Sequence, residues 1–369
     1  MLSILLFILV LIVLILVHEF GHFNVAKMFG IRVDEFGIFF PPKLFGIKWG
    51  ETEYTFNSIP VGGFVKIFGE TVDDESDPSV AKNPRSFVHK PRLVQAAVIV
   101  AGIICNILFA WIVLSAGYVI GMQSAVDHVG VGTVKDAKVT ILDVLPKSPA
   151  DTVGLKMNDI ITSLQTATDI LPQGATSDET RAFIAAHDSQ SIILTVNRNG
   201  TSKTFLAKPA DGIVAGHKAL GVELEDVGIL KLNPALALVQ GAIVTKEMTI
   251  QTAVGLGTFL STIVHGTANY SSVAGPIGIV KIGSAAINSG IIETIFIAAL
   301  ISINLAIINV IPIPGLDGGR LLFIIIEGVR GKPISEKVAT RITIVGFGLL
   351  ILLMLVVSYH DIIRLVYPG

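Results

Sequence analysis

His18, Glu19 and His22 belong to the sequence His-Glu-Phe-Gly-His, in which two histidines are separated by four positions. On a helix this spacing places both imidazoles on one face, where they can bind one divalent metal ion. A glutamate beside them can act as general base toward a metal-bound water. The residue types and their spacing therefore predict a hydrolytic zinc site.

The residues before this motif, Leu2 to Val17, are apolar except for Ser3. At 1.5 Å per residue they extend about 24 Å, and the hydrocarbon core of a bilayer is about 30 Å thick. We expect a retained transmembrane helix rather than a secretory signal, because no basic residue precedes the run and no small-residue cleavage site follows it. Hydrolysis is then expected inside the membrane or at its edge.

Zinc bound by two imidazoles needs a third protein ligand and an open position for water. Asp317 is the preferred third ligand, because it lies in a glycine-flanked turn that we expect to be mobile. Irregular backbone at membrane depth is tolerated where it lines a cavity. We expect His265 to lie in a loop or at the outer boundary, and His360 and Asp361 to be interfacial anchors after the last span.

The composition is that of a membrane protein. Of the 369 residues, 51% are hydrophobic and 15% charged, and the mean hydropathy is +0.72. Soluble domains carry about 25% charged residues. The formal charge is −2 and there is no basic tail or face, which argues against a nucleic-acid partner.

Four segments are long and apolar enough to cross a bilayer: residues 2–17, 93–120, 291–311 and a run beginning at Ile342. Lysines and arginines between residues 33 and 92 place that stretch in the cytoplasm and both termini outside. If residues 241–264 also crossed, Asp317 would emerge on the outer side, far from the two histidines. We therefore expect that segment to be amphipathic or only partly inserted.

Two regions are expected to form β-structure. Residues 51–68 are β-branched and aromatic with a bend at Gly62 and Gly63, which fits either a membrane re-entrant loop or an ordinary cytoplasmic hairpin. Residues 122–232 are soluble in character. They contain a predicted strand at 139–145, a short helix at 179–187 and a hairpin through Asn199-Gly200, which together indicate one α/β module of PDZ size.

The predicted fold is a polytopic α-helical membrane protein with four transmembrane helices. It carries a cytoplasmic-side β-hairpin or re-entrant element and one extracytoplasmic PDZ-like α/β domain. The expected divisions are residues 1–121 for the first two spans, 122–232 for the PDZ-like domain, 233–290 for the amphipathic or partly inserted segment, and 291–369 for the last two spans.

These residues together resemble the site-2 protease family of intramembrane zinc metalloproteases, in its bacterial branch. The matching motifs are HEFGH at 18–22, AGIICN at 101–106, SSVAGPIG at 271–278 and ISINLAIINVIPIPGLDGG at 301–319. The resemblance implies that His18, His22 and Asp317 bind Zn²⁺ and that Glu19 is the catalytic acid and base. Two departures from the family pattern are Ile103, where proline is usual, and Asn158, where glycine is common.

The resemblance also implies substrate contacts. Gly62 and Gly63 look like part of the family's re-entrant β-loop, which presents an edge strand to the unwinding substrate, and Asn304, Pro312 and Pro314 look like substrate-contacting positions. Asn106, a lone polar residue in an apolar helix, is compatible with a hydrogen bond to substrate backbone or with a helix–helix contact, as is Asn304.

The implied substrates are single-pass membrane proteins already trimmed on the outer side, such as anti-sigma factors, or remnant signal peptides. The implied location is the bacterial cytoplasmic membrane, with the PDZ-like module outside, where it either binds substrate ends or excludes bulky ectodomains. One alternative is a transporter or ion pathway with intramembrane His and Asp, although no repeated helix sets support it. Another is a nonproteolytic PDZ scaffold, which leaves Glu19 and Asp317 without a role.

Overall fold

The computed structural model describes residues 2–70, 80, 83–214, 217–267, 274–332 and 334–366. Its contacts divide the chain into two compact units. The membrane unit comprises Met1–Gly117 and Gly241–Gly369, and the second unit, called the outer unit after the location expected from the sequence, comprises Tyr118–Gln240. Residues 271–273 of the SSVAGPIG motif lie outside the described residues. The domain divisions expected from the sequence stay predictions.

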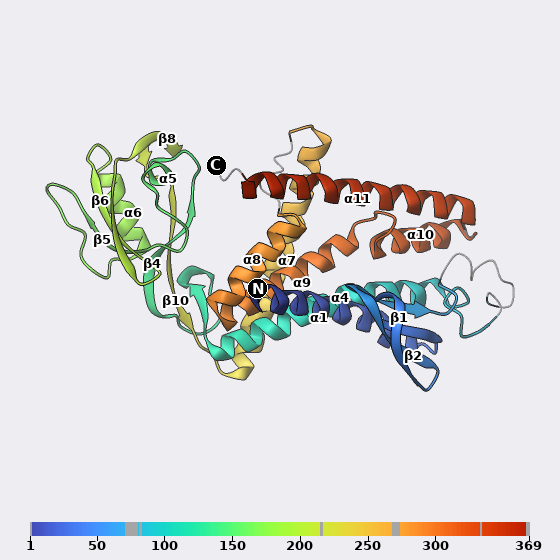
Figure 1. The fold of residues 1–369 in the computed structure, drawn as a ribbon. Coiled ribbons are helices and arrows are strands. Elements are labelled where there is room, and N and C mark those ends of the chain that lie inside the picture. Colours follow the sequence, from blue (N-terminus) through green and yellow to red (C-terminus); the bar gives the residue numbers. More distant parts are fainter. Residues whose placement is uncertain are drawn as a thin grey trace. The chain divides into compact units, whose positions relative to one another are not determined.

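The membrane unit contains the predicted spans. Within the described part of the chain, four helices are long and apolar enough to cross a membrane. They are α1 (Leu2–Met28), α4 (Arg92–Ile120), α9 (Ile291–Val310) and α11 (Glu336–Val366), which appear as the long ribbons of Figure 1. The prediction of four transmembrane helices is confirmed, and α4 is continuous through Ile103, the position where the family pattern has proline.

Two further helices precede α9 in the chain. Helix α7 (Pro234–Val264) begins before the predicted apolar segment and contains Lys246 and Glu247 in its middle. It is not among the candidate spans of the described residues. Its partial insertion stays a prediction. Helix α8 (Pro276–Ser289) follows, and Gly283 packs against Phe7 of α1 so closely that an added Cβ would overlap the ring.

Asp361 was predicted to be an interfacial anchor after the last span, but it lies within α11 and its candidate span. The residue is 5% exposed. Its two carboxylate oxygens accept hydrogen bonds from the backbone N–H groups of Gly275 at 3.2 Å and Gly278 at 2.8 Å. These are unpaired donors at the start of α8, and a carboxylate both satisfies them and complements the positive end of the helix dipole. Asp361 therefore caps α8 from the last span.

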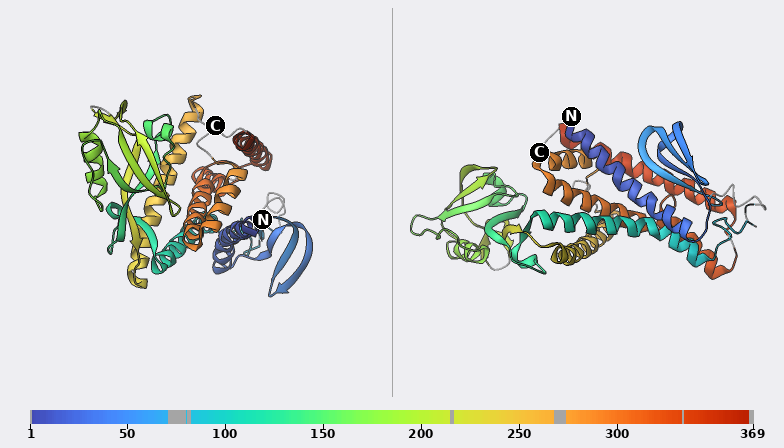
Figure 2. Two further views of the ribbon diagram at one scale, coloured as in Figure 1. Left: turned by 60° about the vertical axis from the view of Figure 1, so that its left-hand side comes forward. Right: turned by 90° about the horizontal axis from the view of Figure 1, so that it is seen from below.

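A curved β-ribbon lies beside α1 in both views of Figure 2. It is formed by β1 (Val33–Trp49) and β2 (Thr52–Ile67), which pair antiparallel. Glu35 pairs with Lys66 on one side and with Glu53 on the other, so the ribbon folds back into four adjacent segments. The sequence predicted β2 but not β1, because Pro41-Pro42 reads against a strand. The structure places these prolines where the ribbon turns back, between Phe40 and Lys43.

The outer unit is built on a six-stranded sheet of order β3-β10-β4-β5-β6-β7, with antiparallel pairing between neighbours. Its elements, in chain order, are β3 (Met122–Ala125), η1 (Val126–His128), β4 (Lys135–Val144), α5 (Pro149–Val153), β5 (Ile160–Gln165), α6 (Ser177–Ala186), β6 (Ile192–Arg198), β7 (Thr201–Ala207), β8 (Ala210–Val214), β9 (His217–Ala219) and β10 (Val222–Leu230). This is the predicted α/β domain, including its strand, helix and hairpin.

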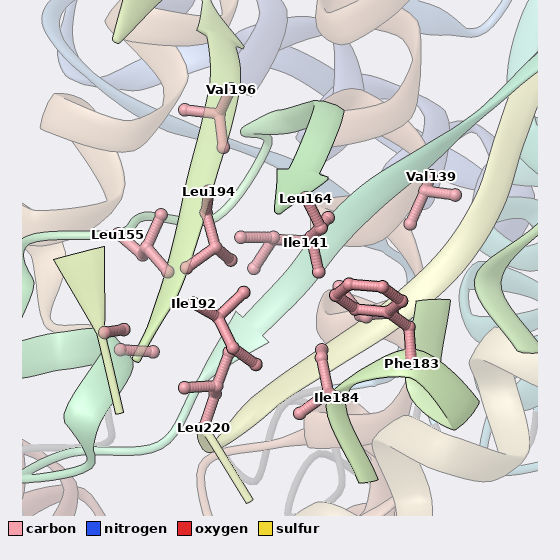
Figure 3. Packing of buried hydrophobic residues seen from close by; sticks show 13 residues of the cluster. Val139, Ile141, Leu155, Leu164, Phe183, Ile184, Ile192, Leu194, Val196 and Leu220 are labelled. Carbon is pink, nitrogen blue, oxygen red and sulfur yellow. The ribbon is translucent and has the colours of Figure 1, made fainter. Parts of the chain in front are cut away.

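The core of the outer unit lies between this sheet and α6. Ile141, Leu164 and Leu194 are fully buried and gather beside Phe183 of α6 (Figure 3). Helix α6 begins with a capping box, in which Thr176 and Glu179 satisfy each other's backbone N–H groups. These features explain how the short helix is held on the sheet.

Asn158 has a φ of 66°, in the left-handed region that favours glycine and tolerates asparagine. Asparagine can therefore form this left-handed turn in place of glycine. Asp159 follows, is 0% exposed and receives two hydrogen bonds of 2.6 Å from Arg198. Burial raises the pKa of Asp159, but the hydrogen bonds and charge of Arg198 outweigh burial and hold this pKa below its ordinary value of 3.8.

Candidate metal centre

Three potential metal ligands converge in the membrane unit. Nε2 of His18 lies 2.9 Å from Oδ2 of Asp317, and Nε2 of His22 lies 3.4 Å from the same oxygen. The two Nε2 atoms are 3.2 Å apart. One ligand atom from each residue lies within 4.8 Å of the other two. The structure thus brings together the two histidines of α1 and the aspartate preferred from the sequence.

The Nδ1 atom of each imidazole forms a hydrogen bond that fixes the orientation of the ring. Nδ1 of His22 lies 2.8 Å from the carbonyl oxygen of Val98 in α4, so this nitrogen carries the proton and donates it. The lone pair of His22 is then on Nε2, which faces the site. A backbone carbonyl on the far nitrogen is a common outer partner of metal-binding histidines.

Asn106 lies against the other histidine. Its amide is 3.2 Å from Nδ1 of His18, and the residue is 0% exposed. The amide oxygen, as assigned, is buried without a hydrogen bond. Since the nitrogen and oxygen of an amide are interchangeable by a flip, the flipped form lets Nδ1–H donate to that oxygen and leaves Nε2 free for a metal. The geometry favours an orienting contact, whereas substrate binding by Asn106 stays a prediction.

The close approach of α4 to α1 requires glycine at two positions. A Cβ at Gly102 would lie 2.4 Å from Nε2 of His22 and 2.8 Å from Cε1 of His18. A Cβ at Gly21 would lie 2.5 Å from the carbonyl oxygen of Ala101. Both distances are too short for real contacts, so the glycines allow the two helices to hold the imidazoles between them.

Asp317 is not in a mobile turn, as the sequence predicted, but is the first residue of helix α10 (Asp317–Arg330). The glycines after it serve close packing. A Cβ at Gly318 would lie 2.3 Å from the carbonyl oxygen of Val310, and one at Gly319 2.4 Å from that of Ile313. A carboxylate in the first turn also complements the helix dipole. The aspartate is therefore presented from a fixed helix end.

Glu19 lies between the histidines in sequence and beside the β-ribbon in space. A Cβ built at Gly63 would lie 3.7 Å from Cγ of Glu19 and 3.3 Å from Cδ2 of Leu16. Gly63 pairs with Ile38 of β1 on one side of its strand. Gly62, with a φ of 78°, makes the adjacent bend against Phe40. Of the two glycines predicted in the re-entrant loop, Gly63 therefore lies beside the glutamate, and Gly62 lies against Phe40.

The structure also places the other residues that were singled out from the sequence. Pro312 and Pro314 occupy the extended link from α9 to α10, immediately before Asp317. The side chain of Asn304 donates to the carbonyl oxygen of Leu300 on its own helix at 2.8 Å. His265 is exposed and bonds Ser261. The substrate-contacting roles of Asn304, Pro312 and Pro314 stay predictions.

Asn309 was not singled out from the sequence. Its amide nitrogen lies 3.5 Å from Nε2 of His18, and the residue is 9% exposed. It is the last residue but one of α9, directly before the Pro-x-Pro link. Asn309 is a polar residue on an apolar helix, in the same motif as Asp317. The criterion that selected Asn106 and Asn304 would therefore also have selected Asn309.

The donor set fits zinc. Two neutral imidazoles and one carboxylate are the protein ligands of a catalytic zinc site that keeps a further position for water. Oδ2 of Asp317 faces both Nε2 atoms and is buried without a conventional hydrogen-bond partner. Within the described residues, this is the cluster of at least three His, Cys, Asp or Glu side chains that could hold a metal ion.

Comparison with known proteins decides the family. Residues 6–353 match Peptidase family M50, and the match covers nearly the whole chain and all three candidate ligand residues. The chain belongs to this family. A protein of Nostoc sp., all3971, is 36% identical over 95% of this chain and 93% of its own length.

Two further relatives are named as metalloproteases. Zinc metalloprotease RasP of Shouchella clausii is 28% identical over 98% of this chain and 99% of its own length. Membrane metalloprotease ARASP of Arabidopsis thaliana, which is chloroplastic, is 31% identical over 96% of this chain and 78% of its own length. With four candidate spans, this M50 protein is a multi-pass intramembrane zinc metalloprotease.

Proposed function

We propose that His18, His22 and Asp317 are the zinc ligands of this protease and that Glu19 is its catalytic acid and base. The convergence of two imidazoles from α1 and a carboxylate from α10 on a common point carries the proposal. A transporter or a scaffold would have no use for this donor set next to a glutamate, so the geometry favours hydrolysis over both alternatives.

Zinc held by His18, His22 and Asp317 would supply Lewis-acid chemistry, which lowers the pKa of water and polarises a peptide carbonyl. Glu19 would take the proton of the attacking water and return it to the leaving amine. The Val98 carbonyl and the Asn106 amide hold the two imidazoles with Nε2 inward. Asn309, beside His18, is positioned to donate a hydrogen bond at the reacting centre.

The substrate segment is proposed to bind as an extended strand. Residues 63–67 of β2 pair with β1 on one side, and within the described residues no strand pairs on the other. This edge begins at Gly63, next to Glu19. A transmembrane helix must unwind before its peptide bonds are accessible, and pairing with a free edge satisfies the exposed backbone groups. Asn304, Pro312 and Pro314 are proposed to contact the same segment.

The proposed substrates are single-pass membrane proteins already trimmed on their outer side, such as anti-sigma factors, or remnant signal peptides. The proposed location is the bacterial cytoplasmic membrane, with the outer unit on the extracytoplasmic face. Its α/β fold and the turn at Asn158-Asp159 support a PDZ-like module. That module either binds newly formed substrate ends or excludes untrimmed ectodomains.

Glu19→Gln tests the central assignment. The purified full-length variant is expected to retain one zinc per chain and to lose cleavage of a model transmembrane substrate, because the amide keeps the shape of the side chain but cannot accept a proton. Retained cleavage would overturn the role of Glu19.

Deletion of the outer unit tests its proposed role. Cleavage of one transmembrane substrate is compared with and without a folded ectodomain, in the wild type and in the deletion. The size-filter role predicts that only the deletion cleaves the substrate with its ectodomain. Unchanged discrimination between the two substrates would rule out that role.

A further inference from the structure

Helix α10 has a loosely packed flank. A cavity of about 360 Å³ lies along it, between the start of α4, the end of β2 and the first turns of α11. Four charged side chains line this cavity together with apolar ones: Glu70, Arg92, Arg320 and Glu327. These four side chains form two ion pairs, each of which links α10 to a neighbouring part of the chain.

One of these contacts begins one helical turn after the ligand Asp317. Arg320 donates to the carboxylate of Glu70 and, from its second terminal nitrogen, to the carbonyl oxygen of Glu70 at 2.8 Å. The Glu70 side chain is 11% exposed. Residues three apart lie on the same side of a helix, so this two-point contact restrains the face of α10 that carries Asp317.

Glu70 belongs to the same stretch of chain as the proposed substrate edge. It follows β2 by three residues, and its N–H bonds the carbonyl oxygen of Ile67 at 3.2 Å. Phe68 is fixed by a 3.0 Å bond from its N–H to the carbonyl oxygen of Arg32. A displacement of Glu70 would therefore act at the end of β2, the strand that also contains Gly63 beside Glu19.

We propose that Glu70 and Arg320 form a positioning pair that holds the free edge of β2 in register with the metal centre. Arg320 fixes the Glu70 end of the strand to the helix that presents Asp317, so a substrate paired with the edge brings its peptide bond to Glu19. The proposal rests on the proposed function. Misplacement of a reacting group by about 1 Å can reduce the rate about 100-fold, so a small shift of the strand has a large effect.

The chain offers a matched control. Arg92 and Glu327 form a second ion pair, at 2.7 Å, between α4 and the same helix α10, and both line the same cavity. This pair fixes α10 to a spanning helix and has no connection to β2. Glu327→Gln removes one charge from the same environment without releasing the strand.

The test compares full-length wild type, Glu70→Gln, Arg320→Gln, Arg320→Lys and Glu327→Gln in detergent. It measures kcat and KM for a single-pass transmembrane substrate, zinc per chain, and backbone hydrogen exchange of residues 59–68. Glu70→Gln and Arg320→Gln are expected to lower kcat about 10- to 100-fold, with zinc retained and exchange at residues 59–68 increased. Arg320→Lys is expected to lower kcat less than Arg320→Gln does. The kcat of Glu327→Gln is expected to stay within about threefold of wild type.

Three results would overturn the positioning role. These are a kcat in Glu70→Gln equal to that of Glu327→Gln, unchanged exchange at residues 59–68, or loss of zinc together with unfolding, which would make the pair a general stabiliser. If wild type binds zinc and does not cleave, the proposed function fails instead. The exchange measurement then still decides whether the pair holds the strand.

Discussion

Nε2 of His18 and Oδ2 of Asp317 lie 2.9 Å apart, although the residues come from opposite ends of the chain. Helices α1 and α10 must therefore come together before the proposed metal site exists. Asp317→Asn keeps the shape of the side chain and removes its charge. We expect at least about a 100-fold loss of zinc affinity and loss of cleavage, measured by metal competition and by substrate hydrolysis.

Asp178→Asn is the control for this change, because its carboxylate is 87% exposed on the outer unit. It is expected to bind zinc as the wild type does. Zinc affinity of Asp317→Asn equal to that of the control would exclude Asp317 as a ligand.

Gly102→Ala tests the close packing of α4 on the two imidazoles. The new methyl group would lie 2.4 Å from Nε2 of His22, so the ring or the helix must move. We expect weaker zinc binding, by about 10- to 100-fold, since displaced ligands lose their orienting contacts. Gly255→Ala on α7, where nothing lies within 4 Å of the new atom, serves as the matched control. Equal zinc affinities in the two variants would contradict the described packing.

Arg198→Ala is expected to destabilise the outer unit by about 3–5 kcal/mol, because it leaves the fully buried carboxylate of Asp159 without its partner. The readout is the thermal unfolding of the outer unit within the full-length protein. The pKa of Asp159 is lower in the folded state than in the unfolded state. The Asp159–Arg198 pair therefore contributes fully to the stability of the fold above about pH 3.8, and this contribution is lost as the pH falls through the lower pKa of the folded state.

The pH dependence provides the control for that variant. Wild type should lose stability as the pH falls through this acidic range, and Arg198→Ala should lose less because the pair is already absent. Parallel stability curves for the two proteins would show that the Asp159–Arg198 contact is not the source of the effect.

Asp361→Ala is expected to loosen the start of α8, because the N–H groups of Gly275 and Gly278 lose their acceptor. Loss of such a cap costs about 1 kcal/mol. Hydrogen exchange should accelerate at residues 274–289. Ile362→Ala, at a side chain that is 49% exposed, should leave this exchange unchanged. The same acceleration in both variants would argue against capping by Asp361.

Much of the molecule could be predicted from the sequence, because its strongest signals are local. The apolar runs predicted four spans, and Asn199-Gly200 predicted a hairpin whose two turn residues both have positive φ. The preference for Asp317 came from its glycine-flanked position together with its expected depth in the membrane, and the structure brings it to the two histidines.

The failures involve contacts that local patterns do not encode. Asp361 was predicted to follow the last span, because nothing in its neighbourhood reveals that it belongs to α11 and reaches the start of α8. The strand β1 was missed because its two prolines lie at a fold in the ribbon that only tertiary pairing defines. Asp317 was assigned to a mobile turn because its glycines read as flexibility, whereas they allow close packing.

X-ray absorption at the zinc edge of purified, active protein is the most direct test of the proposed zinc site, because it identifies the ligands of the bound ion. We expect one zinc per chain, with two imidazole nitrogens at about 2.0–2.1 Å and oxygen atoms as the remaining ligands. The imidazole signal should be halved in His22→Ala. Active protein that contains no transition metal, or a zinc ion without imidazole ligands, would contradict it.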